Sequence, residues 1–211
     1  MPSLSTKLHL DMLNQARGDG QPEKQGLYGL HWGDPDKEPI LKNIRDQWLG
    51  PYVRADHDAV EIGPGGGRWT RYMLGFRHIY AVDYHQELLD ELRKNFAHDN
   101  ISFLKNNGSD FPSIGPRSID YIFSFGVFVH LDIEIIASYM KELKTIIKDD
   151  GNIVIQYADN DKEAARRNAS FSRNNPIIMR AIVKSAGFHI VQEDTESLWH
   201  SSLMRFQPAP P

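Results

Sequence analysis

The stretch Val60-Glu61-Ile62-Gly63-Pro64-Gly65-Gly66-Gly67-Arg68-Trp69-Thr70 joins an apolar run to a turn rich in glycine. The apolar residues at 59–62 predict a buried strand. The glycines predict a tight loop, because glycine adopts positive φ easily and lets a bound molecule approach the backbone. Apolar side chains then recur at helical spacing, which predicts a helix with one buried face after the loop. These side chains are Trp69, Tyr72, Met73 and Phe76.

A second apolar run, at 79–82, ends in Asp83, twenty positions after Gly63. A carboxylate at this distance from a glycine-rich loop can accept hydrogen bonds from both ribose hydroxyls of an adenosine-type ligand. The two strands, the loop and the acid together predict a nucleotide-type ligand.

The spacing of the glycines separates two classes of ligand. The dinucleotide fingerprint is G-x-G-x-x-G, whereas here Gly67 comes one position early and Arg68 takes the place of the last glycine. Glu61 would repel a pyrophosphate, but it suits a ligand that carries an ammonium group and a sulfonium. The stretch resembles motif I, E/D-x-G-x-G-x-G, of the class I S-adenosylmethionine (SAM)-dependent methyltransferases. The resemblance implies SAM as the cofactor, with Asp83 on its ribose.

The composition limits the class of protein. The chain has 211 residues, a formal net charge of -4 and no cysteine. The interspersed charges predict no surface for nucleic acid or membrane, and the lack of cysteine excludes a disulfide framework and a cysteine nucleophile. With no apolar leader and no run of membrane-spanning length, we expect a cytoplasmic protein. Its oligomeric state stays open.

One domain fits this length. We expect an N-terminal helical and lid segment at 1–55, a SAM-binding core at 56–207 and a disordered tail at 208–211. From residue 58 onward strand and helix patterns alternate, which predicts right-handed crossovers and a doubly wound α/β sheet. The family resembled implies seven strands, mainly parallel, with an antiparallel edge strand.

The remaining elements follow from periodicity and from turn residues. We expect helices at 4–12, 40–49, 88–96, 131–147 and 176–186, and further strands at 101–104, 119–125, 153–157, 188–191 and 197–206. Asn175 is a favourable N-cap for the last helix, because Pro176 follows it.

The N-terminal segment at 26–35 is unusually rich in glycine and aromatic residues. Tyr28 and Trp32 either fill the core or close over the cofactor as a lid. The Trp32-Gly33-Asp34-Pro35 stretch is similar to one that precedes motif I in some bacterial methyltransferases, which favours the lid.

The resemblance also implies a set of cofactor-binding residues. In the family, a side chain after the third strand binds the adenine amino group and the next backbone amide donates to the ring. Asn107 and Gly108 stand at those places, although an ordinary Asn-Gly turn is the alternative. The complete set is Tyr28, Trp32, Glu61, Gly63, Gly65, Gly67, Asp83, Tyr84, Asn107, Gly108 and Phe125.

His130 is the first candidate for the catalytic base. It follows the fourth strand by about half a dozen residues, a place where small-molecule methyltransferases often carry a histidine. An imidazole near neutral pKa suits removal of a hydroxyl proton. The alternative is a polar cap on the next helix, and His200 and His31 are weaker candidates.

Two further patterns bear on the reaction. Asp159-Asn160 is similar to paired metal ligands of metal-dependent O-methyltransferases, but Ser124 and Phe125 stand where their first ligand, an aspartate, belongs, so we expect no metal. Arginines lie beside Phe171 in a charged segment, where they could meet an anionic acceptor or simply face solvent. They are Arg166, Arg167 and Arg173.

These features predict a methyltransferase that acts on a hydroxyl of a small-molecule acceptor. The D/N/S-P-P-Y/F/W motif of amino-methylating DNA enzymes is absent and there are no cysteines, so a nucleobase acceptor is disfavoured. The alternatives are N-methylation of a small amine, a non-catalytic SAM-binding scaffold and, less favoured, an NAD(P)-dependent oxidoreductase.

Overall fold

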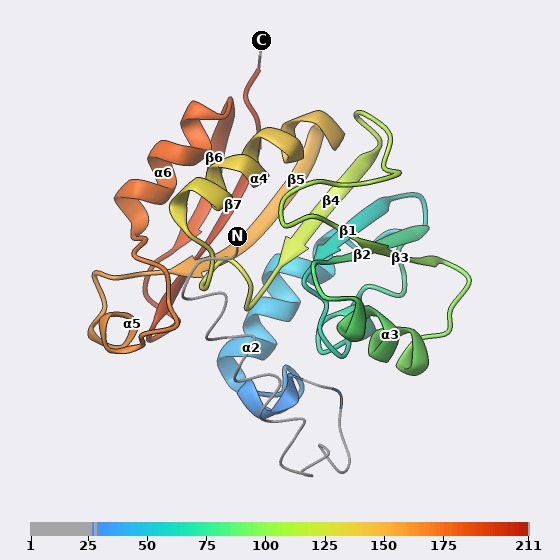
Figure 1. Cartoon of the computed structure of the whole chain (residues 1–211), viewed down its shortest axis with the longest axis horizontal. Coiled ribbons are helices and arrows are strands. Elements are labelled where there is room, and N and C mark those ends of the chain that lie inside the picture. The colour runs from blue at the N-terminus through green and yellow to red at the C-terminus, as the bar shows by residue number, and fades with distance from the viewer. Residues whose placement is uncertain (1–26, 28, 211) are drawn as a thin grey trace.

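The computed structural model describes residue 27 and residues 29–210, and its centre is a seven-stranded sheet in the order β3-β2-β1-β4-β5-β7-β6 (Figure 1). The strands are β1 (Asp58–Ile62), β2 (His78–Asp83), β3 (Ile101–Lys105), β4 (Ile119–Ser124), β5 (Ile147–Ala158), β6 (Phe188–Asp194) and β7 (Ser201–Pro208). β7 is antiparallel to both of its neighbours, and the other neighbouring pairs are parallel. The predicted fold class is confirmed, with the antiparallel strand one position in from the edge.

Helices cover both faces of this sheet. They are α2 (Pro39–Ile44), α3 (Gln86–Asn95), α4 (Ile133–Ile146), α5 (Glu163–Arg167) and α6 (Pro176–Ser185). Figure 1 shows α4 and α6 together over the same part of the sheet, and their apolar side chains share one core cluster. The opposite cluster joins α2, α3 and the segment after the glycine loop. No helix in the described part of the chain is long and apolar enough to span a bilayer.

The periodic helices form where the sequence predicts them. Leu88, Leu89 and Leu92 of α3 are buried, and the Oδ1 of Asn175 caps α6 by accepting a hydrogen bond from the Ile178 N–H at 3.0 Å. α2 continues as a π-helical turn at 45–49, and Ile40, the first residue of the helix predicted at 40–49, is 45% exposed. The predicted helix at 4–12 lies outside the described residues.

The segment that follows the glycine loop is not the expected helix. It forms turns and one short 3₁₀ segment, Thr70–Tyr72. The amides of Tyr72 and Met73 bond three residues back, whereas the Arg71 amide bonds four residues back, to the Gly67 carbonyl. Gly67 enters the segment with a φ of 101°, which is incompatible with a helical first turn. Its apolar side chains still reach the core, since Trp69, Met73 and Phe76 are buried.

Two boundaries of the sheet also differ from expectation. β5 begins at Ile147, directly after α4, and the pairing of β4 with β5 is irregular between Ile119 and Tyr121. Residues 148–152, which lie between the predicted helix at 131–147 and the predicted strand at 153–157, therefore belong to the irregular part of β5 and not to a separate loop. Pro208, expected in the disordered tail, pairs with Phe188 at the end of β7.

Candidate active site

A cavity of about 880 Å³ lies at the carboxyl ends of the parallel strands, at the switch between β1 and β4. This is where doubly wound sheets bind ligands, because neighbouring loops diverge there. Its walls come from the turns after β1, β2, β3 and β4, from the start of α4, and from the segments 29–32, 164–171 and 199–200. The volume is near the upper end of the roughly 300–1,000 Å³ typical of ligand pockets, which suits a cofactor with an acceptor beside it.

The glycine loop forms one wall because its backbone takes conformations that other residues resist. Gly63, Gly65 and Gly67 all have positive φ, at 70°, 57° and 101°. Gly63 and Gly65 line the cavity, whereas Gly67 packs against the ring of Phe96, where a Cβ would clash. Gly67 therefore shapes the loop from behind rather than facing the cavity.

Glu61 lies beneath the same loop. It is buried, it is not among the residues that line the cavity, and its Oε2 accepts a hydrogen bond from the Thr70 hydroxyl. Burial raises the pKa of Glu61 to about 7, partly offset by the hydrogen bond from Thr70 and the charge of Arg68. In this structure Glu61 thus ties β1 to the segment after the loop, and its contact with the cofactor stays a prediction.

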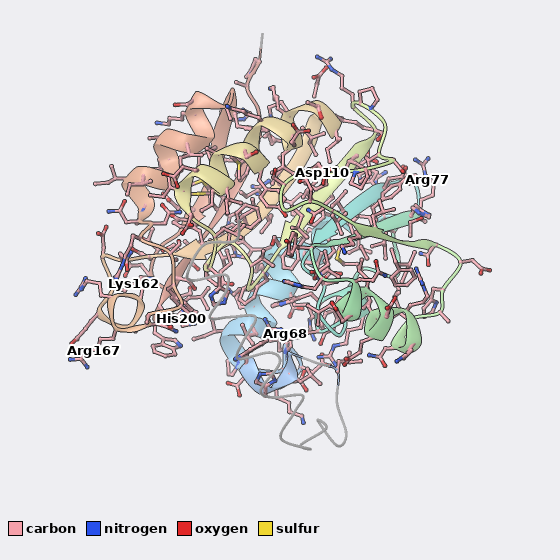
Figure 2. All side chains as sticks on the ribbon, in the orientation of Figure 1. Arg68, Arg77, Asp110, Lys162, Arg167 and His200 are labelled. Atoms are coloured by element: carbon pink, nitrogen blue, oxygen red, sulfur yellow. The ribbon has the colours of Figure 1, made fainter. Side chains whose placement is uncertain are left out.

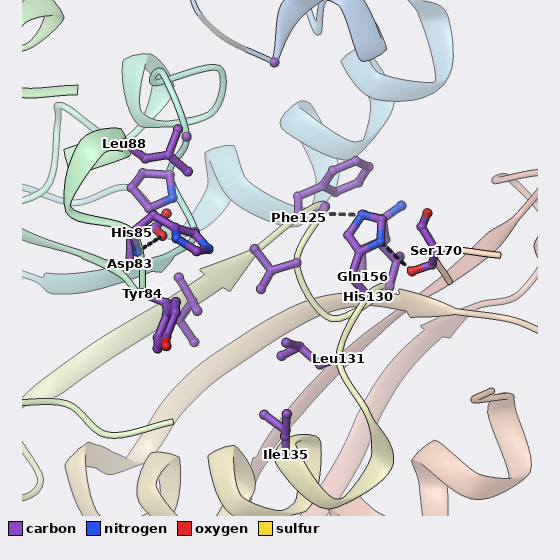
Figure 3. Close-up of a pocket in the computed structure, with 18 of the residues that line it drawn as sticks. Asp83, Tyr84, His85, Leu88, Phe125, His130, Leu131, Ile135, Gln156 and Ser170 are labelled. Carbon is purple, nitrogen blue, oxygen red and sulfur yellow. Dashed lines mark hydrogen bonds between the residues drawn. The ribbon is translucent and has the colours of Figure 1, made fainter. Parts of the chain in front are cut away.

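Asp83 is placed as predicted, at the end of β2 and on the cavity wall. Its Oδ1 accepts the backbone N–H of His85 at 2.8 Å, and burial raises its pKa to about 7 (Figure 3). Hydroxyl donors from a ribose would stabilise the ionised form of this carboxylate. Tyr84 lies beside it on the wall and is 40% exposed.

The turn after β3 lines the cavity but satisfies its own polar groups. The Oδ1 of Asn107 accepts the amides of Ser109 and Asp110 at 3.2 and 3.3 Å. The Gly108 amide donates to the Oδ1 of Asn106 at 3.2 Å. The turn interpretation of Asn107-Gly108 therefore has structural support, and an adenine contact would have to compete with these bonds or share them.

His130 lines the opposite side of the cavity from Asp83, as Figure 3 shows. Its Nδ1 lies 2.9 Å from the Ser170 carbonyl oxygen, and its ring meets that of Phe171 edge-on at 5.3 Å. Because a carbonyl only accepts, Nδ1 holds the proton and Nε2 is the basic nitrogen. Burial lowers the pKa of His130 below 6.5, so the neutral form prevails at pH 7.

The weaker histidine candidates also line the cavity. Burial, followed by the charge of Lys162, lowers the pKa of His200 to about 4, which makes it a poor base at neutral pH. His31 is exposed beside Trp32, with ring centroids 4.0 Å apart, and Trp32 is 50% exposed. His31 and Trp32 belong to the N-terminal segment and line the cavity. Tyr28 lies outside the described residues.

The charged segment at 159–175 contributes to the cavity, but its three arginines do not line it. Arg166 donates to the carbonyls of Asn160 and Asp161, and Arg167 pairs with Glu163. Figure 2 shows Arg167 at the outer edge of the molecule. The segment instead presents Phe171 and the Ser170 carbonyl.

Asp159 is hydrogen-bonded within the protein. It accepts a hydrogen bond from the buried Ser202 hydroxyl at 2.7 Å and caps the turn that follows β5. Within the described residues, no group of three or more histidine and acidic side chains could hold a metal ion.

Two residues on the wall escaped the sequence analysis. Gln156, buried in β5, accepts the Gly126 N–H at 2.7 Å and donates to the Ser201 hydroxyl at 2.7 Å, so it fixes the turn after β4. Arg68 is buried against the cavity. A glutamine within an apolar strand is a detectable signal, whereas nothing in the sequence shows which way Arg68 points.

This arrangement fits SAM. A buried carboxylate stands at the end of β2, a glycine loop with positive φ stands at the end of β1, and both line one cavity. A Cβ at Gly63 would clash with Val127, so the close approach of the loop to the turn after β4 requires glycine. Asp83 would hold the ribose, with Gly63 and Gly65 along the amino-acid part. When bound, SAM supplies a methyl group on an electrophilic sulfonium.

Comparisons with solved structures agree with the fold. A SAM-dependent methyltransferase from Clostridium acetobutylicum is 13% identical with a TM-score of 0.68, covering 86% of this chain and 96% of that one. The CcbJ methyltransferase from Streptomyces caelestis is 16% identical with a TM-score of 0.65, covering 84% and 99%. The complex of DhpI with S-adenosylhomocysteine (SAH) is 16% identical with a TM-score of 0.66, covering 87% and 89%. At these identities the likeness shows the fold, and no curated protein sequence matches the chain.

Residues 59–151 match the family model described as a methyltransferase domain. The matched part runs from β1 into β5 and contains the glycine loop and Asp83. Residues 59–151 therefore carry a methyltransferase domain, and the fold is shared with SAM-dependent methyltransferases. The predicted enzyme class and cofactor are thereby confirmed.

Proposed function

We propose that this methyltransferase acts on a hydroxyl of a small-molecule acceptor and that His130 is its general base. One observation carries the proposal, namely the 2.9 Å contact between the His130 Nδ1 and the Ser170 carbonyl on the cavity wall. The contact selects the tautomer in which Nε2 can take a proton, and a hydroxyl acceptor has to lose one.

The chemical nature of the cavity around His130 indicates an acceptor with an apolar body. Apolar side chains line this part, among them Val129, Leu131, Ile135 and Phe171. The arginines of the neighbouring segment are exposed and do not line it, so an acceptor carrying several negative charges would find few partners here.

The role of the protein in the reaction is mainly to position the acceptor and remove its proton. The apolar walls keep water from the reacting groups, and Nε2 of His130 would take the proton of the acceptor hydroxyl. SAM, when bound, would supply the methyl group to the acceptor oxygen, with its S–CH3 bond broken and SAH as the leaving group. The resulting imidazolium keeps its Nδ1–H on the Ser170 carbonyl, which stabilises the positive charge. Release of the proton to solvent restores the neutral base.

The test is a screen of hydroxylated and amino metabolites with SAM labelled in its methyl group, followed by analysis of the methylated atom. We expect label on oxygen, in compounds with an aromatic or aliphatic body. Transfer only to amines would contradict the hydroxyl assignment, because a neutral amine is nucleophilic without a base. In that case a His130→Ala variant should keep most of its turnover.

A further inference from the structure

Arg68 occupies an unusual place for a charged side chain. It follows Gly67 directly, is only 6% exposed, and lines the cavity. In the view of Figure 2 it lies in the lower centre, away from the outer edge of the molecule. Its guanidinium lies over the Phe125 ring at 5.3 Å, and a Cβ on Gly126 would come within 3.7 Å of Nη2. The guanidinium therefore stands where the glycine loop faces the turn after β4.

This buried cation has no anionic partner in the described part of the chain. Its one hydrogen bond is long, from Nη1 to the Gly33 carbonyl at 3.5 Å, and it forms no salt bridge. Arg71, three positions later, pairs with both Asp34 and Asp36. Burial lowers the pKa of Arg68 to about 10, so the group stays protonated at neutral pH.

Burying a guanidinium without an anion carries a desolvation penalty, and a carboxylate that binds it in bidentate geometry offsets this penalty. Cation–π contacts with Phe125 and Trp69 offset only part of this cost. Glu61 raises the pKa of Arg68 through its charge but bonds to Thr70 instead. The unsatisfied donors and the cavity beside them thus point to an anionic group of a ligand.

We infer that Arg68 binds the carboxylate of the methionyl part of the cofactor. The ribose end of the cavity is marked by Asp83, at the end of β2, and the glycine loop at the end of β1 leads directly into Arg68. SAM carries one carboxylate, at the end of its molecule opposite the adenine. In this orientation the Asp83 carboxylate accepts hydrogen bonds from the ribose hydroxyls, and the Arg68 guanidinium binds the carboxylate of the cofactor. The inference rests on the cofactor and not on the acceptor proposed above.

The test compares two ligands that differ by one group, SAH and its analogue lacking only the carboxyl group. Their affinities are measured by calorimetry for the wild type, Arg68→Gln and Arg68→Met. We expect the wild type to prefer SAH about 10- to 100-fold, the range typical of a hydrogen bond to a charged group. Both variants should lose that preference by weakening SAH alone, with the analogue bound as in the wild type.

Arg71→Gln is the matched control, because Arg71 belongs to the same turn but does not line the cavity. It should retain the wild-type preference for SAH. Unchanged binding of the analogue also shows that each Arg68 variant is folded, and Met preserves the apolar stem of the buried side chain.

Two outcomes would overturn the assignment. An equal loss of affinity for both ligands would mean that Arg68 only supports the loop. SAH affinity that is unchanged in the Arg68 variants would mean that the cofactor carboxylate binds elsewhere, and a raised KM for an acidic acceptor would then assign Arg68 to the acceptor. No methyl transfer is needed for the binding experiment, so its result is independent of whether the acceptor is a hydroxyl.

Discussion

The Nδ1 of His130 and the carbonyl oxygen of Ser170 lie 2.9 Å apart, although forty positions separate them in the chain. The backbone of the segment after α5 thereby sets the tautomer of an imidazole that follows β4. The same segment supplies Phe171, whose ring lies edge-on to the imidazole. His130 is consequently held in one orientation by two neighbours, which a general base requires and a solvent-facing helix cap does not.

Replacing His130 by alanine should lower turnover about 10²–10⁴-fold while SAH affinity stays within a factor of about two to three. The reason is that the imidazole takes the acceptor proton and does not hold the cofactor. His31→Ala is the control, because His31 also lines the cavity but stands in the exposed N-terminal segment. Nearly full turnover in His130→Ala would rule out its role as base, and an unfolded variant would identify it as structural.

The same base predicts a pH dependence. Burial lowers the pKa of His130 below 6.5, so kcat/KM should rise with pH through a value below 6.5 and be level above pH 7. The rising limb should disappear from the residual activity of His130→Ala. A limb centred well above pH 7 would point to ionisation of the acceptor itself.

Replacing Asp83 by alanine should weaken SAH binding roughly ten- to hundredfold, because two ribose hydroxyls lose their acceptor. Affinity in the wild type should also increase between pH 6 and pH 8, since the carboxyl, with a pKa of about 7, ionises in that range and the ionised form accepts both donors. Calorimetry across this range measures both effects. Wild-type affinity in Asp83→Ala would refute the ribose assignment.

Glu61 and Asp83 together predict how stability varies with pH. Burial raises both pKa values to about 7, whereas in the unfolded chain these groups ionise near pH 4. Between about pH 4 and pH 7 the folded protein therefore holds protons that the unfolded chain has released. The free energy of unfolding of the ligand-free protein should fall as pH rises through this window. Denaturant unfolding at several pH values measures it, and Asp83→Asn should make the decline shallower than in the wild type.

The N-terminal segment should become more ordered when cofactor binds. Gly29, His31 and Trp32 line the cavity, and Asp34 is tied to Arg71. Hydrogen exchange at 29–35 should slow on addition of SAH, while exchange in α6, away from the cavity walls, should not change. Unchanged exchange at 29–35 together with protection at Asp83 would show that the segment is a fixed wall and not a lid.

Gly67→Ala should destabilise the protein by roughly 2–4 kcal/mol. The backbone φ of 101° disfavours a side chain, and the new Cβ would clash with the Phe96 ring. Gly115→Ala is the matched control, since Gly115 is exposed and its nearest neighbour for a Cβ, the Ser118 hydroxyl, is 3.9 Å away. Chemical denaturation measures both changes, and equal stabilities of the two variants would contradict this account.

Local patterns in the sequence were enough to predict the sheet and several residues of the cavity wall. Apolar periodicity separates strand from helix because it follows the period of each backbone, and it predicted α3, α4 and α6. The glycine register and the position of Asp83 predicted SAM, because both are set by the short path from one strand end to the next. These features depend on residues close together in the chain.

What the tertiary structure decided is the direction and partner of individual side chains. The segment after Gly67 does not begin as a helix because Gly67, packed against Phe96 just after α3, has a φ of 101°. Glu61 turned to Thr70, the arginines of the segment 159–175 turned outward, and Arg68 turned to the cavity. Each of these outcomes depends on neighbours brought together by folding, whose burial and hydrogen bonds a linear pattern does not contain.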